Sequence, residues 1–64
     1  MKADQARALS DIDLHKELEA SRRELFNLRL RVATKQLANN REVSKTKRKV
    51  ARLQTIIRER QLSA

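Results

Sequence analysis

The feature that most limits the fold of this chain is a row of small and apolar residues at alternating intervals of four and three. The row comprises Leu14, Leu18, Ser21, Leu25, Leu28 and Val32. Residues at such intervals share one narrow face of an α-helix, and a helix with one narrow apolar face packs against another helix as a coiled coil. The row therefore predicts one long helix that needs a helical partner.

A second row with the same spacing lies in the C-terminal half and comprises Val43, Thr46, Val50, Leu53 and Ile57. Asn39 and Asn40 separate the two rows, and asparagine is suited both to ending one helix and to capping the next. So short a connection makes neighbouring helices antiparallel. Folding the chain back about residues 37 and 38 predicts three pairs across the seam: Val32 with Val43, Leu25 with Val50, and Leu18 with Ile57.

The predicted fold is all-α: two long helices in an antiparallel coiled-coil hairpin, with a short N-terminal helical turn. Ser10 is a suitable N-cap, so we expect helix one to span about residues 10–37. Helix two is expected over about 40–61, with Asn39 and Glu42 forming a capping box at its start. Residues 1–9 are too few for a stable isolated helix, and we expect a frayed or partner-ordered turn there. The 64 residues can form one domain at most, so residues 1–64 are predicted to be a single helical-hairpin domain.

A second apolar stripe runs along helix one on a different face from the seam. It comprises Phe26, Leu30, Ala33 and Leu37. Because one helix turns only one face to a single partner helix, the hairpin leaves this stripe uncovered. We therefore expect these four residues to dock on another molecule, with Phe26 stacking on an RNA base or packing on a neighbouring protein.

The charge of the chain indicates a polyanionic partner. Sixteen Lys and Arg against eight Asp and Glu give a net charge of +8. Residues 1–38 hold eight basic and six acidic side chains, whereas residues 39–64 hold eight basic and two acidic, so helix two carries the excess. Nucleic acid is the first candidate and an anionic membrane surface the second, although a surface-bound helix carries bulky aromatics and this chain has one Phe. No apolar run approaches the ~20 residues of a membrane span, so membrane insertion is not expected.

Nothing in the sequence indicates catalysis or a cofactor. Cys is absent, and His15 is the only His and has no second ligand to complete a metal site. Glu17 and Glu24 share a helix face, but a hairpin offers no pocket to perturb them, and we expect them to pair with nearby Lys and Arg. The chain is therefore predicted to be no enzyme and to bind no metal, cofactor or small-molecule substrate.

Segments along almost the whole chain resemble one protein family. They are MKA at residues 1–3, FNLR at 26–29, AT at 33–34, QL at 36–37, KRKVARLQT at 47–55 and RER at 58–60. The family is that of the twenty-ninth protein of the bacterial large ribosomal subunit. The resemblance implies a cytoplasmic structural protein of the ribosome that contributes to translation. It also implies a two-helix hairpin on ribosomal RNA near the nascent-peptide exit, beside a neighbouring large-subunit protein.

One position departs from that family, in which many members have Gly where this chain has Lys35. If the Gly permits a close approach of the backbone to RNA, Lys35 must contact the RNA differently, as a phosphate ligand. Among the RNA contacts expected for this chain, Lys35 is therefore the one for which the family pattern gives the least guidance.

Charge and resemblance together predict a structural protein that binds ribosomal RNA through phosphate charge and shape, because a helix cannot enter the deep groove of A-form RNA. The expected RNA-binding residues are cations and neutral hydrogen-bonding side chains: Arg22, Asn27, Arg29, Thr34, Lys35, Gln36, Arg41, Lys45, Arg48, Arg52 and Thr55. The alternative is a dimeric basic coiled coil that binds DNA. It is less favoured because a zipper places its basic region before an uninterrupted seam, whereas here the densest basic run lies inside the second row.

Overall fold

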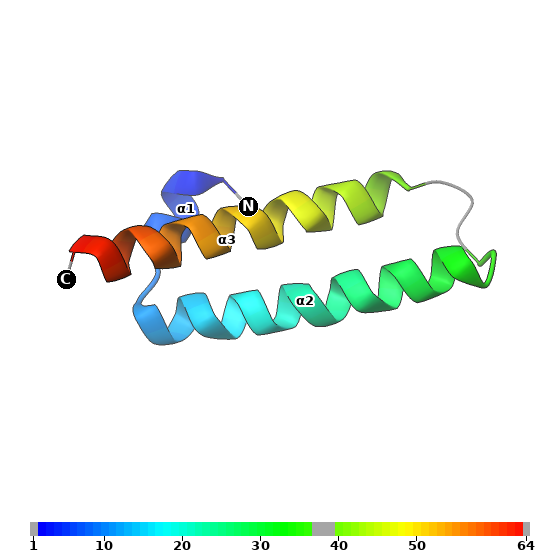
Figure 1. Ribbon diagram of the computed structural model, residues 1–64, viewed down its shortest axis with the longest axis horizontal. Coiled ribbons are helices and arrows are strands. Elements are labelled where there is room, and N and C mark those ends of the chain that lie inside the picture. Colours follow the sequence, from blue (N-terminus) through cyan, green and yellow to red (C-terminus); the bar gives the residue numbers. More distant parts are fainter. Residues whose placement is uncertain (1, 37–39, 64) are drawn as a thin grey trace.

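The computed structural model describes residues 2–36 and 40–63, which form three helices and no strand. α1 spans Ala3–Arg7, α2 spans Asp11–Ala33 and α3 spans Arg41–Ser63. α2 and α3 run antiparallel and side by side, and α1 lies against the C-terminal half of α3 (Figure 1). The molecule is a rod with extents of 44 × 17 × 16 Å, and the predicted helical hairpin is confirmed.

Ser10 caps the start of α2, as its hydroxyl predicted. Its Oγ accepts a hydrogen bond of 3.2 Å from the backbone N–H of Asp13. Asp11 and Asp13 lie in the first turn, where their negative charge is stabilised by the helix dipole. Leu9, just before the cap, packs against the core that contains Leu14, and this contact fixes the direction in which the chain enters α2.

The core is a single line of side chains that includes most of the predicted seam. Its central cluster comprises Ala6, Leu14, Leu18, Val50, Leu53 and Ile56, with Leu9, Leu25 and Ile57 packed against it. Ser21, Leu28 and Thr46, also seam residues, are buried as well. Val32 and Val43 are half-buried at the opposite end of the rod from α1. Residues from both rows thus meet between the helices, while the three residue pairs expected across the seam stay predictions.

The expectation of a frayed or partner-ordered N-terminal turn is wrong, because α1 packs on α3 of the same chain. Ala6 is fully buried and shares the core with Ile56, which is only 2% exposed. Ile56 lies beside Arg7 of α1, whereas the predicted seam residue Ile57 is half-buried. A two-helix hairpin buries one face of α3, and the third helix buries a second face, which the seam pattern alone did not reveal.

α2 ends at Ala33 and not at residue 37 as expected. The backbone N–H of Lys35 donates to the carbonyl of Val32 at 3.0 Å, and that of Gln36 donates to the carbonyl of Arg31 at 2.8 Å. These two bonds form a Schellman motif, which satisfies the last carbonyls of the helix and stops it. The seam spacing cannot locate this stop because it records only which residues are apolar.

Residues 37–39 lie outside the described part of the chain. The capping box of Asn39 with Glu42 and the docking role of Leu37 therefore stay predictions. α3 begins at Arg41, close to the expected start near residue 40, and continues to Ser63, two residues beyond the expected end.

Candidate nucleic-acid interface

α3 carries a row of exposed cations on the helix face opposite its seam residues, and Lys45 at one edge of this row also borders α2. Arg41, Lys45, Arg48 and Arg52 follow one another at intervals of four, three and four residues, so they share one helix face. All four are exposed, whereas Val50 on the same helix is buried in the core. The structure thus brings four predicted RNA-binding residues together on one outward surface, named here the α3 basic stripe.

The two flanks of the hairpin, where α2 and α3 meet, differ in charge. On one flank Glu17 pairs with Lys49 at 2.8 Å. A hollow on that flank is lined by Glu24, Glu42, Lys45, Thr46 and Lys49. A groove on the other flank is lined by Arg29, Val32, Asn40, Val43, Ser44 and Lys47, with no acid among these residues. Glutamates therefore offset the positive charge of the first flank, and the second is a basic flank.

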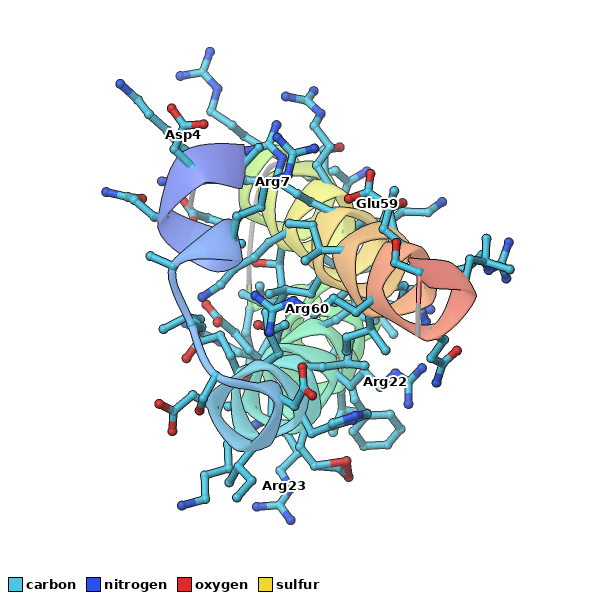
Figure 2. The ribbon with its side chains drawn as sticks, turned by 90° about the vertical axis from the view of Figure 1, so that its left-hand side faces the viewer. Asp4, Arg7, Arg22, Arg23, Glu59 and Arg60 are labelled. Atoms are coloured by element: carbon cyan, nitrogen blue, oxygen red, sulfur yellow. The ribbon has the colours of Figure 1, made fainter. Side chains whose placement is uncertain are left out.

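α2 contributes Arg22 and Arg29 to the basic flank. They are seven residues apart, so they lie on one face of α2, and both are exposed. Figure 2 shows Arg22 projecting from α2 on the side away from α1. Asn27 is exposed on α2 as well. Asn27 lies two residues before Arg29 and therefore on a different face of α2, so Arg22 and Arg29 are the predicted contacts of this helix that face the basic flank.

Two of the predicted neutral contacts already donate their hydroxyl hydrogens inside the protein. Thr34 Oγ1 donates to the carbonyl of Leu30 at 3.0 Å, and Thr55 Oγ1 donates to the carbonyl of Ala51 at 2.9 Å. Each hydroxyl oxygen still has lone pairs. In this state they can accept a hydrogen bond, for example from a ribose 2′-hydroxyl, but they cannot donate one to a phosphate.

Lys35 has a positive φ of 62°, in the left-handed region that favours glycine. Its position after the last turn of α2 is the one at which a Schellman motif usually has Gly. Helix termination therefore explains a Gly at this position in the resembling family, with no need for a close approach to RNA. The side chains of Lys35 and Gln36 are both exposed and remain predicted contacts.

The described residues of the second apolar stripe are exposed, as the sequence predicted. Phe26 and Leu30 are 68% and 53% exposed although both are large and apolar, and Ala33 is exposed too. The structure adds Ile12, which is 69% exposed and lies on the same face of α2. Sequence reasoning missed Ile12 because Glu19 occupies the intervening position and interrupts the row. Ile12, Phe26, Leu30 and Ala33 are named here the α2 apolar stripe.

Arg60 and Arg7 hold α1 against the hairpin, a role that the sequence did not reveal. Arg60 donates from Nη1 to Asp11 Oδ1 and from Nη2 to the carbonyl of Arg7, both at 2.9 Å. Arg7 also approaches Glu59, with 3.6 Å between Nη2 and Oε1. Figure 2 shows Arg60 where the three helices converge. Arg60 and Asp11 are 49 residues apart, a separation at which no local spacing signals a contact.

The described residues contain no group of three or more His, Cys, Asp or Glu that could hold a metal ion. His15 is exposed and lines a shallow groove with Asp11, Ile57, Arg60 and Gln61. Within the same part of the chain, no helix has both the length and the apolar character needed to cross a membrane. The chemistry of the surface therefore rests on its cations and on the α2 apolar stripe.

Comparison with known proteins identifies the family. The model of the Ribosomal L29 protein family matches residues 4–60. This chain belongs to that family. The large ribosomal subunit protein uL29 of Finegoldia magna is 52% identical over 98% of this chain and 93% of its own length. Proteins of the same name from Dehalococcoides mccartyi and Caldicellulosiruptor bescii are 50% and 48% identical, over 88% and 97% of this chain and 86% of their own lengths.

Membership confirms the resemblance of the FNLR and KRKVARLQT segments, because the matched region contains both. It also confirms that the chain is a ribosomal protein with a structural and not an enzymatic role.

Proposed function

We propose that this chain is a structural constituent of the large ribosomal subunit in the cytoplasm, where it binds ribosomal RNA and contributes to translation. The observation that carries the proposal is the α3 basic stripe, an exposed row of four cations, in a member of a ribosomal protein family. Relatives named large ribosomal subunit protein match it over nearly its whole length. A polyanionic partner relieves the repulsion among these cations.

The binding mode that the surface supports is contact with phosphates. The α3 basic stripe, Arg22 and Arg29 supply charge along a rod too thick to enter the deep groove of A-form RNA. Asn27, Gln36 and Lys35 add hydrogen bonds near the α2 side, and the oxygens of Thr34 and Thr55 accept from ribose hydroxyls. Such contacts position the protein on RNA by shape, without reading base sequence.

The α2 apolar stripe supports contact with a second partner, a neighbouring large-subunit protein near the exit of the nascent-peptide tunnel. Phe26 and Leu30 form an exposed apolar surface on α2, while the α3 basic stripe lies on the other long helix. Because the two surfaces are on different helices, RNA and protein can be bound at the same time. The stripe excludes water only when such a partner covers it.

The alternative function, a dimeric basic coiled coil on DNA, receives no support from the fold. In such a protein the seam joins two chains. Here Leu18 of α2 and Val50 of α3 share a core within one chain, so the seam is already occupied.

The test measures the salt dependence of RNA binding. If about six phosphates are neutralised, affinity falls roughly a thousandfold between 50 and 200 mM salt. Replacing Lys45, Arg48 and Arg52 with Gln removes three contacts and lowers the salt slope by about two to three. Filter binding or fluorescence anisotropy with large-subunit RNA fragments gives the slope.

A matched control replaces Lys16, Arg23 and Arg31 with Gln. These residues are exposed cations of α2 outside the predicted contacts, so the variant has the same net charge as the first. Equal slopes for the two variants would show that net charge and not the α3 basic stripe governs binding. Salt-insensitive RNA binding by the unmodified chain would contradict the proposal itself.

A further inference from the structure

The groove on the basic flank is a distinct feature at the end of the rod away from α1. It is lined by Arg29, Val32, Asn40, Val43, Ser44 and Lys47 and has a volume of about 370 Å³. This volume lies within the ~300–1,000 Å³ of typical small-ligand sites. The groove is large enough for a compact ligand with both apolar and polar parts.

The floor and rim of the groove differ in chemistry. Val32 and Val43 are half-buried, so each contributes part of an apolar side chain to the floor. Arg29 and Lys47 are exposed, and neither forms an ion pair with another described residue. Ser44, with its hydroxyl group, completes one edge of the rim. An apolar floor between two uncompensated cations matches a flat apolar group with phosphates attached.

The groove is continuous with the surface proposed to bind RNA. An adjoining hollow is lined by Ser44, Lys47, Arg48 and Ala51, so Ser44 and Lys47 border both depressions. Arg48 belongs to the α3 basic stripe. An RNA backbone that follows the stripe therefore reaches the groove within one helical turn of α3.

We propose that this groove holds one unpaired nucleotide turned out of an RNA helix. The base lies on Val32 and Val43, Arg29 and Lys47 hold the flanking phosphates, and Ser44 contacts the ribose or the base edge. In the hollow on the opposite flank, Glu24 and Glu42 offset the positive charge of Lys45 and Lys49, so that hollow attracts phosphate less strongly than the groove does. The inference rests on the proposed RNA binding and adds to it a preference for an irregular site in the RNA.

The experiment compares binding to a short RNA duplex with one unpaired nucleotide and to the fully paired duplex, for each of the four bases. The chain is expected to bind the bulged RNA about tenfold more tightly, because placing one face of the base in the groove removes apolar surface from contact with water. With 2-aminopurine at the bulge, binding is expected to protect the fluorescence from quenching by acrylamide.

Ser44→Leu fills the groove from an exposed position, and Ser63→Leu is the matched control, an exposed serine nineteen residues further along α3 and away from the groove. Ser44→Leu is expected to bind both RNAs equally, while Ser63→Leu retains the preference. Lys47→Gln is expected to lower the salt slope for the bulged RNA by about one more than for the paired RNA if it holds a flanking phosphate. Circular dichroism of each variant establishes that helicity is unchanged.

The outcomes separate this inference from the proposed function. Equal, salt-dependent binding of both RNAs by the unmodified chain overturns the nucleotide site and leaves RNA binding intact. Absence of salt-dependent binding to either RNA contradicts both. A photocrosslinker at position 44 that labels a neighbouring protein and no RNA in assembled particles would show that a protein occupies the groove, which also overturns the inference.

Discussion

Lys35 holds the end of α2 in a backbone conformation that costs free energy. Its φ of 62° brings the β-carbon close to the backbone, at about 1–2 kcal/mol for a residue other than glycine. The cost is offset by the Schellman hydrogen bonds to Val32 and Arg31. A glycine at this position would adopt the same conformation without that cost.

Replacing Lys35 with Gly is expected to raise the free energy of unfolding by about 1 kcal/mol, because the left-handed conformation no longer opposes a β-carbon. Urea denaturation followed by circular dichroism measures the change. Lys35→Ala is the control, since it removes the same charge but keeps the β-carbon. An equal gain in both variants would assign the effect to charge and contradict the conformational explanation.

Replacing Ser10, the N-cap of α2, or Ser21, within α2, with Ala is expected to change the free energy of unfolding in opposite directions. Ser21 is 1% exposed and its Oγ has no hydrogen-bond partner among the described residues. Ser21→Ala is therefore expected to stabilise the fold by ~1 kcal/mol, by removing an unpaired buried hydroxyl and improving helix propensity. Ser10→Ala is expected to cost ~1 kcal/mol, because its hydroxyl caps the helix. Thermal melts of both variants decide the signs, and a loss on Ser21→Ala would mean that its hydroxyl is satisfied in solution.

At the scale of elements, α1 is held by few contacts. It has five residues, too few to be stable alone, and its docking depends on Ala6 in the core and on Arg60. The backbone N–H of Ala8 donates to Asp4 and that of Leu9 donates to Ala6, so these amides report whether α1 is formed. α1 is therefore the element expected to open first.

Arg60→Gln is expected to speed hydrogen exchange at Ala8 and Leu9 while global stability falls by no more than ~1 kcal/mol, as is usual for partly exposed ion pairs. NMR-detected exchange at low and high salt measures both amides. Arg58→Gln, an exposed position two residues earlier, is the control. Equally faster hydrogen exchange at amides along α2 and α3 would show that Arg60 supports the whole hairpin and not α1 in particular.

The elements were predictable where local spacing determines them. The seam rows located α2 and α3, and Ser10 located the start of α2, because helix periodicity and capping depend on neighbouring residues. The burial of Ile56 was not predictable, since it depends on α1 returning to α3 from about fifty residues away. The same reason hid the bond between Arg60 and Asp11.

The candidate site was likewise predictable only where local spacing determines the position of a residue. The exposure of Arg48 and Phe26 followed from their positions opposite or beside the seam, and the structure places both on the surface. The groove that joins Arg29 to Lys47 depends on how α2 and α3 face each other, which is tertiary information. Sequence reasoning therefore named Arg29 as an RNA contact but did not name Lys47, nor did it place the two residues on one groove.

At the scale of the whole molecule, the thin rod divides its surface by function. Its extents of 17 and 16 Å leave room for one line of core residues between the long helices. Three other surfaces of the described residues are open to a partner: the α3 basic stripe, the basic flank and the α2 apolar stripe. A protein of this shape gains order from what it binds, because its own core is small.

The seam between α2 and α3 and the α2 apolar stripe are expected to separate folding from assembly. Leu53 is fully buried against α2, and Leu53→Ala is expected to cost about 2–4 kcal/mol of unfolding free energy. Phe26 is 68% exposed, so Phe26→Ala is expected to change the melting of the free chain by no more than ~0.5 kcal/mol. Circular dichroism melts of the two variants measure this difference.

Incorporation into ribosomal particles is the measurement that distinguishes the two roles. Phe26→Ala is expected to compete poorly with the unmodified chain for assembly, because burial of a large aromatic against a partner contributes ~1–3 kcal/mol. Ile12→Ala is the matched control, since Ile12 is exposed to the same extent on the same face but lies fourteen residues away from Phe26. Reduced incorporation of Phe26→Ala alone places the partner at the C-terminal part of α2. Reduced incorporation of both variants extends the contact along the helix. Full competition by Phe26→Ala would show that no partner covers the ring, and melting as low as that of Leu53→Ala would show that the ring belongs to the core.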